Sequence, residues 1–391
     1  TGLGINIIDL GLSTTPTVEI ATASENAQGG IILTASHNPK QWNALKLLNE
    51  KGEFISAKDG EKLLNIIEKD IYSFSEVDDL GTIKTDNTYF KKHIDEVLNL
   101  DLVDKTLIKK ANLKVVIDCV NSTGGIVLPQ LLQALGVKEV VNLYCEPNGE
   151  FPHNPEPLPE NLSEISKVVI ENKAAVGIVV DPDVDRLAMV CEDGTMFGEE
   201  YTLVAVADHI LINTPGNTVS NLSSTRALRD VTESHQSNYQ ASAVGEVNVV
   251  EKMKATNAVI GGEGNGGIIY PTSHCGRDAL VGIGLFLTLL AKKNIKASEL
   301  RDSYPKYVIS KNKIQLTPEI DVDKILIKMK DKYAKYPVNT IDGVKIELEN
   351  EWVHLRKSNT EPIIRIYAES SSSTNANALG ERFINEIKSL I

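Results

Sequence analysis

This sequence of 391 residues has few cysteines, no long apolar run and fewer basic than acidic residues, and each of these excludes a class of protein. It has four cysteines and no Cys-x-x-Cys pair, which excludes a disulfide-rich secreted domain and indicates a reducing, cytoplasmic setting. The longest apolar run, residues 279–291, is shorter than the roughly 20 residues that span a bilayer, so we expect no membrane segment. Lys and Arg total 40 against 53 Asp and Glu, and the formal net charge of -13 opposes broad attraction to nucleic acid or an anionic membrane.

What is present is the composition of a folded globular protein. Hydrophobic residues make up 42% and charged residues 24%, and the chain is too long for one ordinary domain. Short apolar runs alternate with amphipathic segments, as where residues 31–33 are followed by apolar residues at helical spacing over 58–71. A strand over 113–120, a helix over 124–135 and a strand over 137–143 form a βαβ pattern, which predicts a parallel sheet.

The C-terminal part has a different pattern. From Val308 onward we predict a strand, a helix over 321–333, three further strands and a final helix, which is an α+β arrangement. The predicted fold is therefore α/β, with three successive α/β domains on mixed or parallel sheets and a C-terminal α+β domain. The domains we expect are residues 1–100, 101–196, 197–306 and 307–391.

The first candidate site is the segment TASHNP at residues 34–39, directly after the apolar run 31–33. A serine followed by His, Asn and Pro cannot continue a strand or a helix, so Ser36 is expected on a turn at a strand's carboxyl end. That is where α/β proteins bind ligands. An ordinary turn or N-cap serine is the alternative, and taken alone it is the commoner one. Lys46 could bring a cation or a proton carrier to the same loop, or be a surface lysine.

The second candidate site is the segment DPDVDR at residues 181–186, which follows the apolar run 176–180. Asp181, Asp183 and Asp185 alternate, and Pro182 keeps them out of a helix, so they can converge on a hard divalent cation such as Mg²⁺. An EF-hand is excluded because Arg186 stands at the position of the turn glycine and a strand precedes the loop. A solvated acidic turn stays open, although Arg186 beside a cation site suggests that an anion such as phosphate arrives there.

The third candidate site is the glycine-rich segment GEGNGG at residues 262–267. It matches the dinucleotide pattern G-x-G-x-x-G by letter, but a strand ended by Pro271 follows where that pattern needs a helix. Glu263 and Asn265 offer instead a carboxylate and an amide, which suit sugar hydroxyls. A simple hairpin turn is the equally weighted alternative.

The fourth candidate site is the segment RKSNTEP at residues 356–362, followed by a strand that carries Arg365. Two guanidinium groups, two hydroxyls, an amide and loop N–H groups within ten residues form a plausible anion pocket in an otherwise acidic chain. A solvated charged loop is the alternative.

Taken together and in this order, the four segments resemble the α-D-phosphohexomutase superfamily, which includes phosphoglucomutases, phosphomannomutases and phosphoglucosamine mutases. Residues 34–39 look like its phosphoserine loop, 181–186 its metal loop, 262–267 its sugar-recognition loop and 356–362 its phosphate-binding loop. Residues 151–161 are similar to its proline-rich loop. The resemblance covers essentially the whole chain and implies four domains around a central cleft.

The resemblance implies a Mg²⁺-dependent mutase that moves phosphate between the 1- and 6-positions of a hexose or hexosamine, through a phosphoserine at Ser36 and a hexose 1,6-bisphosphate. It favours phosphoglucosamine mutase over phosphomannomutase and phosphoglucomutase. A catalytically silent phosphosugar-binding protein is the runner-up, and a dehydrogenase the weakest alternative. The expected catalytic groups are Ser36, His37, Lys46 and Arg186; the metal ligands Ser36, Asp181, Asp183 and Asp185; and the substrate-binding groups Glu263, Asn265, Arg277, Arg356, Ser358, Asn359, Thr360 and Arg365.

Three features depart from the family pattern. Ala44 stands where many relatives have glycine, and Gly267 where several have a histidine, so the identity of a proton carrier at that position is open. The sequence also leads directly into the apolar residues 5–10 without the family's first strand or its N-terminal Gly/Arg loop. We therefore expect the first domain to be incomplete in this chain.

Overall fold

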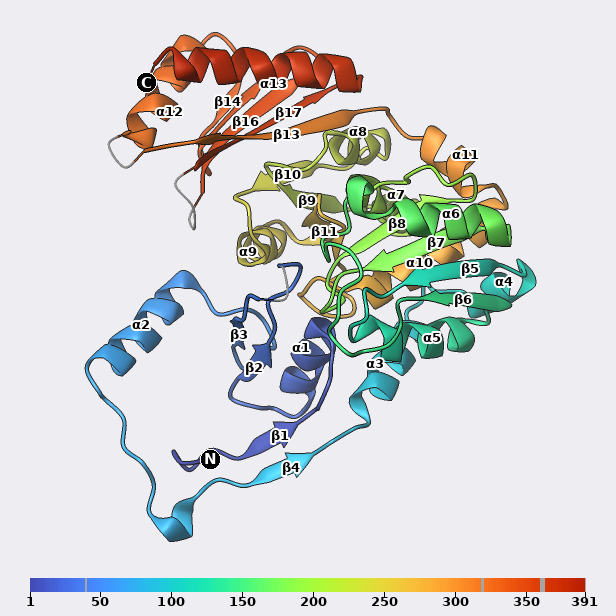
Figure 1. The fold of residues 1–391 in the computed structure, drawn as a ribbon, viewed down its shortest axis with the longest axis vertical. Coiled ribbons are helices and arrows are strands. Elements are labelled where there is room, and N and C mark those ends of the chain that lie inside the picture. Colours follow the sequence, from blue (N-terminus) through green and yellow to red (C-terminus); the bar gives the residue numbers. More distant parts are fainter. Residues whose placement is uncertain (39–40, 318–319, 359–362, 391) are drawn as a thin grey trace.

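The computed structural model of the chain describes residues 1–38, 41–317, 320–358 and 363–390. Within these residues the strands form two 2-stranded, two 4-stranded and one 5-stranded sheet. The parts follow one another in an arc from the N-terminal segment to the C-terminal sheet (Figure 1). Each sheet falls inside one of the predicted domains, whose boundaries stay a prediction. No helix in the described part of the chain is long and apolar enough to cross a membrane.

The N-terminal segment contains two short strand pairs. β1 (Ile7–Asp9) lies parallel to β4 (Ile83–Thr85), and β2 (Gly30–Leu33) lies antiparallel to β3 (Leu45–Leu48). The helix predicted over 58–71 is present as α2, but none of its residues is buried and it stands apart from the sheets (Figure 1). The helical elements of the segment are α1 (Thr15–Ser24), α2 (Ala57–Glu68), η1 (Val77–Asp79) and α3 (Tyr89–Leu98).

The next sheet has the order β6-β5-β7-β8. The predicted βαβ unit is confirmed, because β5 (Lys114–Asp118) pairs in parallel with both β6 (Glu139–Leu143) and β7 (Val176–Val180). Helix α5 (Gly124–Leu135) ends at Gly136, whose φ of 84° is the left-handed conformation that glycine adopts readily. β8 (Leu187–Cys191) returns antiparallel to β7, so residues 181–186 connect two strands at the carboxyl end of β7. The remaining elements are α4 (Lys105–Lys110), η2 (Pro159–Asn161) and α6 (Ser163–Asn172).

The third sheet repeats this arrangement in the order β10-β9-β11-β12. β9 (Asn217–Asn221), β10 (Tyr239–Ser242) and β11 (Ala258–Glu263) are parallel, and β12 (Gly267–Ile269) returns antiparallel to β11. The glycine-rich segment therefore connects the two strands of a hairpin, which was one of its two interpretations from the sequence. The helices are α7 (Glu199–Asn213), α8 (Ala227–Ser234), α9 (Glu246–Thr256), α10 (Ala279–Lys293) and α11 (Ala297–Asp302). In α10, residues 279–290 are all buried, in a core shared with the preceding sheet.

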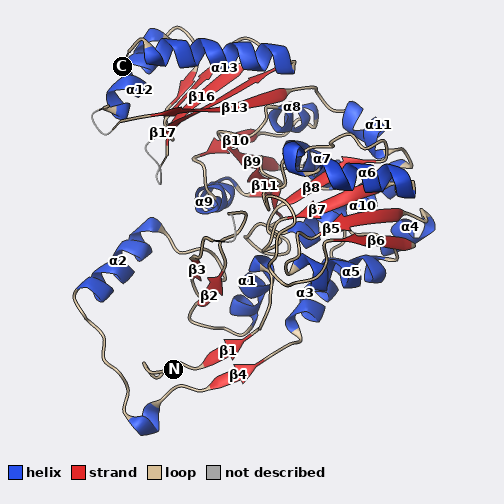
Figure 2. Cartoon of the chain, viewed as in Figure 1, coloured by secondary structure: helices blue, strands red, loops and turns tan. Residues whose placement is uncertain are grey.

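The C-terminal sheet is antiparallel throughout, in the order β13-β17-β16-β15-β14. Its helices α12 (Val322–Lys332) and α13 (Ser373–Lys388) cover the sheet over a separate hydrophobic core, so the predicted α+β pattern is confirmed (Figure 2). The strands are β13 (Val308–Gln315), β14 (Val338–Asn339), β15 (Val344–Glu347), β16 (Trp352–Lys357) and β17 (Ile363–Ser370).

Candidate active site

Ser36 lies on the turn that follows β2, as predicted. Its φ of 50° is the left-handed conformation, and its backbone N–H donates a hydrogen bond to Thr34 Oγ1 at 2.9 Å. The Ser36 hydroxyl donates to Asp181 Oδ2 at 3.3 Å and lies 3.4 Å from His37 Nδ1. The turn thus brings a nucleophilic oxygen to the segment 181–186, which is 145 residues away in the sequence.

The three aspartates of residues 181–186 form a buried carboxylate cluster. Asp181, Asp183 and Asp185 each offer an oxygen, and these oxygens lie within 4.8 Å of one another. Val184 turns the loop with a φ of 62°, a conformation that β-branched residues rarely adopt. Asp181 Oδ1 holds the turn by accepting the N–H groups of Asp185 and Arg186 at 3.2 and 3.1 Å.

The carboxylate cluster fits a hard divalent cation. Asp183 Oδ1 and Asp185 Oδ1 are buried and have no hydrogen-bond partner, which is costly unless another group compensates them. Carboxylate oxygens are the ligands that Mg²⁺ prefers in proteins. Burial raises the pKa of Asp181, and Asp185 and Asp183 raise it further, as expected for negative charges crowded together without a cation.

Two cationic side chains face the cluster from outside residues 181–186. Lys46 Nζ lies 2.6 Å from Asp183 Oδ2 and 2.8 Å from Asp185 Oδ2. Burial alone lowers the pKa of Lys46, but Asp185 and Asp183 outweigh it and hold the pKa above its usual value. Lys46 is therefore a charged partner of the aspartates in this structure, and its predicted role as a proton carrier stays a prediction. The second cation, Arg277, is described below.

Arg186 and His37 border the cluster. Arg186 Nε lies 3.9 Å from Asp181 Oδ2 and from Asp185 Oδ1, and Arg186 Nη1 lies 3.5 Å from Glu156 of the proline-rich loop. Burial and the positive charge of Arg186 lower the pKa of His37 to about 3, so its ring is neutral near neutral pH. A neutral imidazole and a cation beside Ser36 are compatible with an anionic group at that position.

The glycine-rich segment places Glu263 in a buried position. Glu263 Oε1 accepts Asn221 Nδ2 at 2.7 Å and Gly245 N at 3.0 Å, and Arg277 Nη1 donates to Glu263 Oε2 at 2.8 Å. Asn265 is partly buried, and its Oδ1 accepts the N–H of Gly267 at 3.1 Å. Whether Glu263 and Asn265 contact a sugar stays a prediction.

The tight turn of this segment depends on Gly266. Its φ of 85° is left-handed, and a Cβ at that position would lie 2.1 Å from Leu187 O at the start of β8. The glycine therefore permits the segment to pack directly against the residues that follow 181–186.

Arg277 is buried and donates to three carboxylates. Its Nη2 donates to Asp185 Oδ2 at 2.7 Å, its Nη1 to Glu263 at 2.8 Å, and its Nε to Glu246 Oε2 at 2.9 Å. In this structure Arg277 is bonded to carboxylates of the protein itself. Its predicted contact with the substrate stays a prediction. Burial and the nearby Glu19 carboxylate raise the pKa of Glu246 to about 8.

Arg356 and Arg365 face each other on neighbouring strands of the C-terminal sheet. They are direct partners in the antiparallel register of β16 and β17. Two positive charges in such a pair repel each other, and a nearby anion would relieve this repulsion. Arg356 Nε pairs with Asp342 at 3.0 Å, and Ser358 N donates to Ile363 O at 3.1 Å. Two more predicted members of this site, Asn359 and Thr360, lie outside the described residues.

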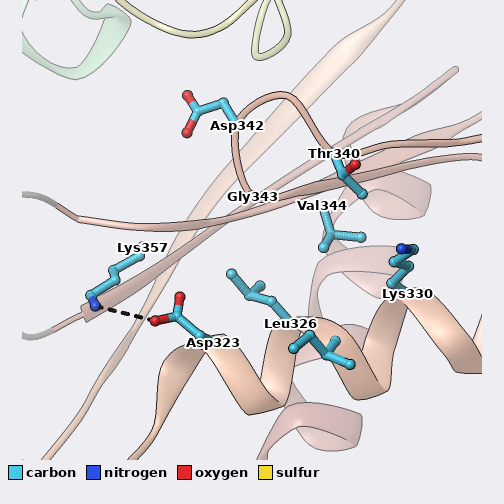
Figure 3. Close-up of a pocket in the computed structure, with 9 residues that line it drawn as sticks. Asp323, Leu326, Lys330, Thr340, Asp342, Gly343, Val344 and Lys357 are labelled. Carbon is cyan, nitrogen blue, oxygen red and sulfur yellow. Dashed lines mark ion pairs between the residues drawn. The ribbon is translucent and has the colours of Figure 1, made fainter.

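A separate pocket of about 370 Å³ adjoins these strands (Figure 3). It is lined by residues of α12, of β15 and of the turn before it, and by Lys357, whose Nζ lies 3.8 Å from Asp323. Asp342, the partner of Arg356, is one of the residues that line it. The Ser36 hydroxyl and the carboxylate cluster belong to a different part of the molecule.

Sequence reasoning missed several residues that shape the site. Thr15 Oγ1 donates to Asp183 Oδ2 at 2.5 Å, and the hydroxyls of Ser122 and Thr123 both donate to Pro182 O at 2.7 Å. Thr15 begins a helix directly before a proline, which marks a helix start but gives no sign of the aspartate 168 residues away. Glu246, after Gly245 at the start of α9, carries no sequence signal that it would pair with Arg277.

Comparison with known proteins finds one family over nearly the whole chain. Phosphoglucomutase/phosphomannomutase alpha/beta/alpha domain I matches residues 1–73, domain II 91–194, domain III 198–307, and the C-terminal domain 313–386. The chain is 30% identical over 391 residues to a probable phosphoglucosamine mutase of Methanopyrus kandleri, covering 99% of this chain and 85% of that protein.

Two further similarities agree with this match. A phosphoglucomutase/phosphomannomutase of Thermococcus kodakarensis is 34% identical over 377 residues, covering 95% of this chain and 81% of that protein. Among solved structures, a phosphoglucomutase/phosphomannomutase family protein from Burkholderia thailandensis is similar with a TM-score of 0.85 and 25% identity. That similarity covers 99% of this chain and 84% of the other.

Proposed function

The chain belongs to the phosphoglucomutase/phosphomannomutase family, and from this premise we propose that it interconverts hexose or hexosamine 1-phosphates and 6-phosphates. We propose glucosamine phosphate as the preferred substrate, since relatives similar over most of their length include a probable phosphoglucosamine mutase and a phosphoglucosamine/phosphogalactosamine mutase. The alternatives are glucose and mannose phosphates, after the phosphoglucomutase/phosphomannomutase relative. The cytoplasm is the proposed location, which free cysteines suit.

One observation carries the proposal: the Ser36 hydroxyl lies 3.3 Å from a buried carboxylate cluster that has two oxygens without a partner. A serine alone is a weak nucleophile, and a cluster of aspartates alone only binds cations. Together they suit a phosphoserine that is held beside a divalent cation. We propose Mg²⁺ at Asp181, Asp183 and Asp185, with a phosphate oxygen on Ser36 as a further ligand.

In the proposed reaction, a sugar hydroxyl attacks the phosphorus on Ser36, the bond between phosphorus and Ser36 Oγ breaks, and the sugar becomes a 1,6-bisphosphate. The sugar hydroxyl loses its proton and Ser36 Oγ gains one; our candidate for the proton carrier is Lys46, which would act in the neutral form that a cation on Asp183 and Asp185 would favour. After the bisphosphate turns over, Ser36 Oγ attacks the other phosphate and the first step runs in reverse. The cation, when bound, offsets charge on the phosphoryl group during transfer.

The remaining groups bind and orient the sugar in this proposal. Arg356 and Arg365, with Ser358, Asn359 and Thr360, bind the phosphate that is not being transferred, which their opposed register supports. Glu263 and Asn265 contact the sugar hydroxyls, and Arg186 and His37 lie beside the transferring phosphate.

A substrate panel tests the proposal. Glucosamine, glucose and mannose 1-phosphates are incubated with the protein, Mg²⁺ and a catalytic amount of the hexose 1,6-bisphosphate, and formation of each 6-phosphate is measured. We expect turnover of at least one sugar, with glucosamine fastest, and a loss of activity in Ser36→Ala. Absence of turnover for all three sugars would contradict the mutase function, whereas a faster glucose or mannose reaction would contradict only the substrate preference.

A further inference from the structure

One arginine connects the carboxylate cluster to the glycine-rich segment. Arg277 donates through Nη2 to Asp185 Oδ2 at 2.7 Å and through Nη1 to Glu263 Oε2 at 2.8 Å. Asp185 belongs to the loop between β7 and β8, and Glu263 to the end of β11, so these two bonds join different sheets. The position of one carboxylate is therefore fixed relative to the other through a single guanidinium group.

A third bond prevents this guanidinium from turning away. Glu246, the first residue of α9, accepts Arg277 Nε at 2.9 Å, and Gly245 just before it donates its N–H to Glu263. Arg277 is only 7% exposed. A planar fork with donors on three nitrogens can serve three carboxylates at fixed angles, which the single ammonium group of lysine cannot do.

The hydrogen bonds also determine which carboxylate oxygens remain free to bind a cation or a sugar. Asp185 Oδ2 accepts from both Arg277 and Lys46, which leaves Asp185 Oδ1 buried without a hydrogen-bond partner. Glu263 Oε1 accepts from Asn221 and from the backbone, so Arg277 holds the other oxygen, Oε2. A cation that takes part of the charge of Asp185 weakens the hold of Asp185 on Arg277 and thereby changes the charge and orientation offered at Glu263.

We propose that Arg277 is a positioning residue that couples cation binding at Asp185 to sugar binding at Glu263, an inference that rests on the proposed mutase function. Arg277 contacts neither ligand in this scheme and acts through the two carboxylates. Linkage requires the coupling to be reciprocal: the sugar phosphate changes the affinity for the cation by the factor by which the cation changes the affinity for the sugar phosphate.

The test measures this factor in three proteins. Mn²⁺ serves as a spectroscopic probe of the cation site, and its dissociation constant is measured by electron paramagnetic resonance with and without saturating glucosamine 6-phosphate. Arg277→Lys keeps the positive charge but loses the fork. Arg382→Lys is the matched control, since Arg382 lies half-exposed on α13 of the C-terminal domain, near Glu386. Circular dichroism checks that each variant is folded.

We expect the wild-type protein and Arg382→Lys to show a change of at least about fivefold in Mn²⁺ affinity on sugar binding, in the usual range of such couplings. Arg277→Lys is expected to bring this factor to within about twofold of one. If Arg277→Lys does not fold, Glu246→Ala provides the second test, because it removes the acceptor of Arg277 Nε and leaves Arg277, Asp185 and Glu263 in place. It should lower the factor to an intermediate value.

Two results overturn the inference: no coupling in the wild-type protein, or the wild-type factor retained in the folded Arg277→Lys and Glu246→Ala variants. Failure of the proposed function looks different, because a wild-type protein that turns over no hexose phosphate contradicts the mutase assignment itself. An active wild-type protein with unchanged coupling in the variants contradicts only the role of Arg277.

Discussion

Replacing Asp183 by asparagine removes one negative charge from the carboxylate cluster with little change in shape. Asp183 is buried, and its Oδ2 accepts from Lys46 at 2.6 Å and from Thr15 at 2.5 Å. Its other oxygen, Oδ1, has no hydrogen-bond partner and is the atom available to a cation. Asparagine can keep one acceptor for Lys46 and Thr15, so the variant is expected to fold, but it offers the cation a neutral oxygen or an amide N–H instead of a charge.

The size of the effect follows from the spacing of the cluster. Its oxygens lie within 4.8 Å of one another, so a cation held between them lies nearer than this to each carboxylate. Two opposite unit charges at about 4 Å attract each other by about 4 kcal/mol at an effective dielectric constant of about 20. A dication doubles this attraction, while the lost hydration of the cation and the carboxylate offsets most of it. A net loss of about 2 to 4 kcal/mol remains, which is roughly a thirtyfold to thousandfold weaker cation affinity.

The assay titrates Mg²⁺ by isothermal calorimetry and measures the rate at saturating sugar phosphate as Mg²⁺ is varied. We expect Asp183→Asn to need far more Mg²⁺ and to turn over slowly even at saturation. Asp193→Asn is the matched control, since Asp193 lies in the turn after β8, where it accepts hydrogen bonds from Thr195, and should behave as wild type. Near-normal Mg²⁺ affinity and rates in Asp183→Asn would refute the cation site.

Three further predictions concern other parts of the molecule. Ser36→Ala should lose both turnover and the single phosphoryl group that peptide mass spectrometry finds after treatment with hexose 1,6-bisphosphate; a label on another residue would contradict the carrier role. Arg356→Ala should weaken binding of glucosamine 6-phosphate tenfold to a hundredfold, since a charge-assisted hydrogen bond contributes about 1.5 to 3 kcal/mol, and unchanged affinity in calorimetry would place the distal phosphate elsewhere. Burial lowers the pKa of His354 from 6.5 to about 4, so the unfolded chain binds the extra proton first. The free energy of unfolding is therefore unaffected by His354 above about pH 6.5, and it falls by up to about 3 kcal/mol as the pH drops toward 4. Melting of His354→Asn should therefore depend less on pH in this window than melting of wild type, and equal slopes would contradict the assignment.

The sequence predicted those parts of the fold that local signals specify. The βαβ unit of β5, α5 and β6 follows from apolar runs of the right length and from Gly136, which ends the helix in a left-handed conformation. Helix α2 was predicted from the same kind of periodicity, yet all of its residues are partly or fully exposed. Periodicity indicates which face of a helix is apolar, but it does not indicate what covers that face.

In the candidate site, too, the sequence predicted the local features and missed the long-range contacts. Asp181, Asp183 and Asp185 could be predicted as a cluster because alternate positions on a turn bring side chains together locally. The bonds of Arg277 to Asp185 and of Thr15 to Asp183 could not, because they join residues 92 and 168 positions apart and depend on how the sheets pack. Local spacing therefore predicts the ligands of such a site, and tertiary packing decides which cations balance them.

The charges around the site explain why a divalent cation suits it. Five buried carboxylates belong to one connected group, and three cationic side chains, Lys46, Arg186 and Arg277, lie against them. The formal charge of this group is five negative against three positive, but burial raises the pKa of Glu246 to about 8 and the pKa of Asp181 above its usual value, so protons neutralise part of the negative charge. A divalent cation can take the place of these protons, because it stabilises the ionised carboxylates that burial and mutual repulsion disfavour. In the mechanism that we propose, the cation is shared with a phosphate on Ser36, and the guanidinium group of Arg186 beside the same cluster offsets part of the added negative charge. The five carboxylates are Asp181, Asp183, Asp185, Glu246 and Glu263.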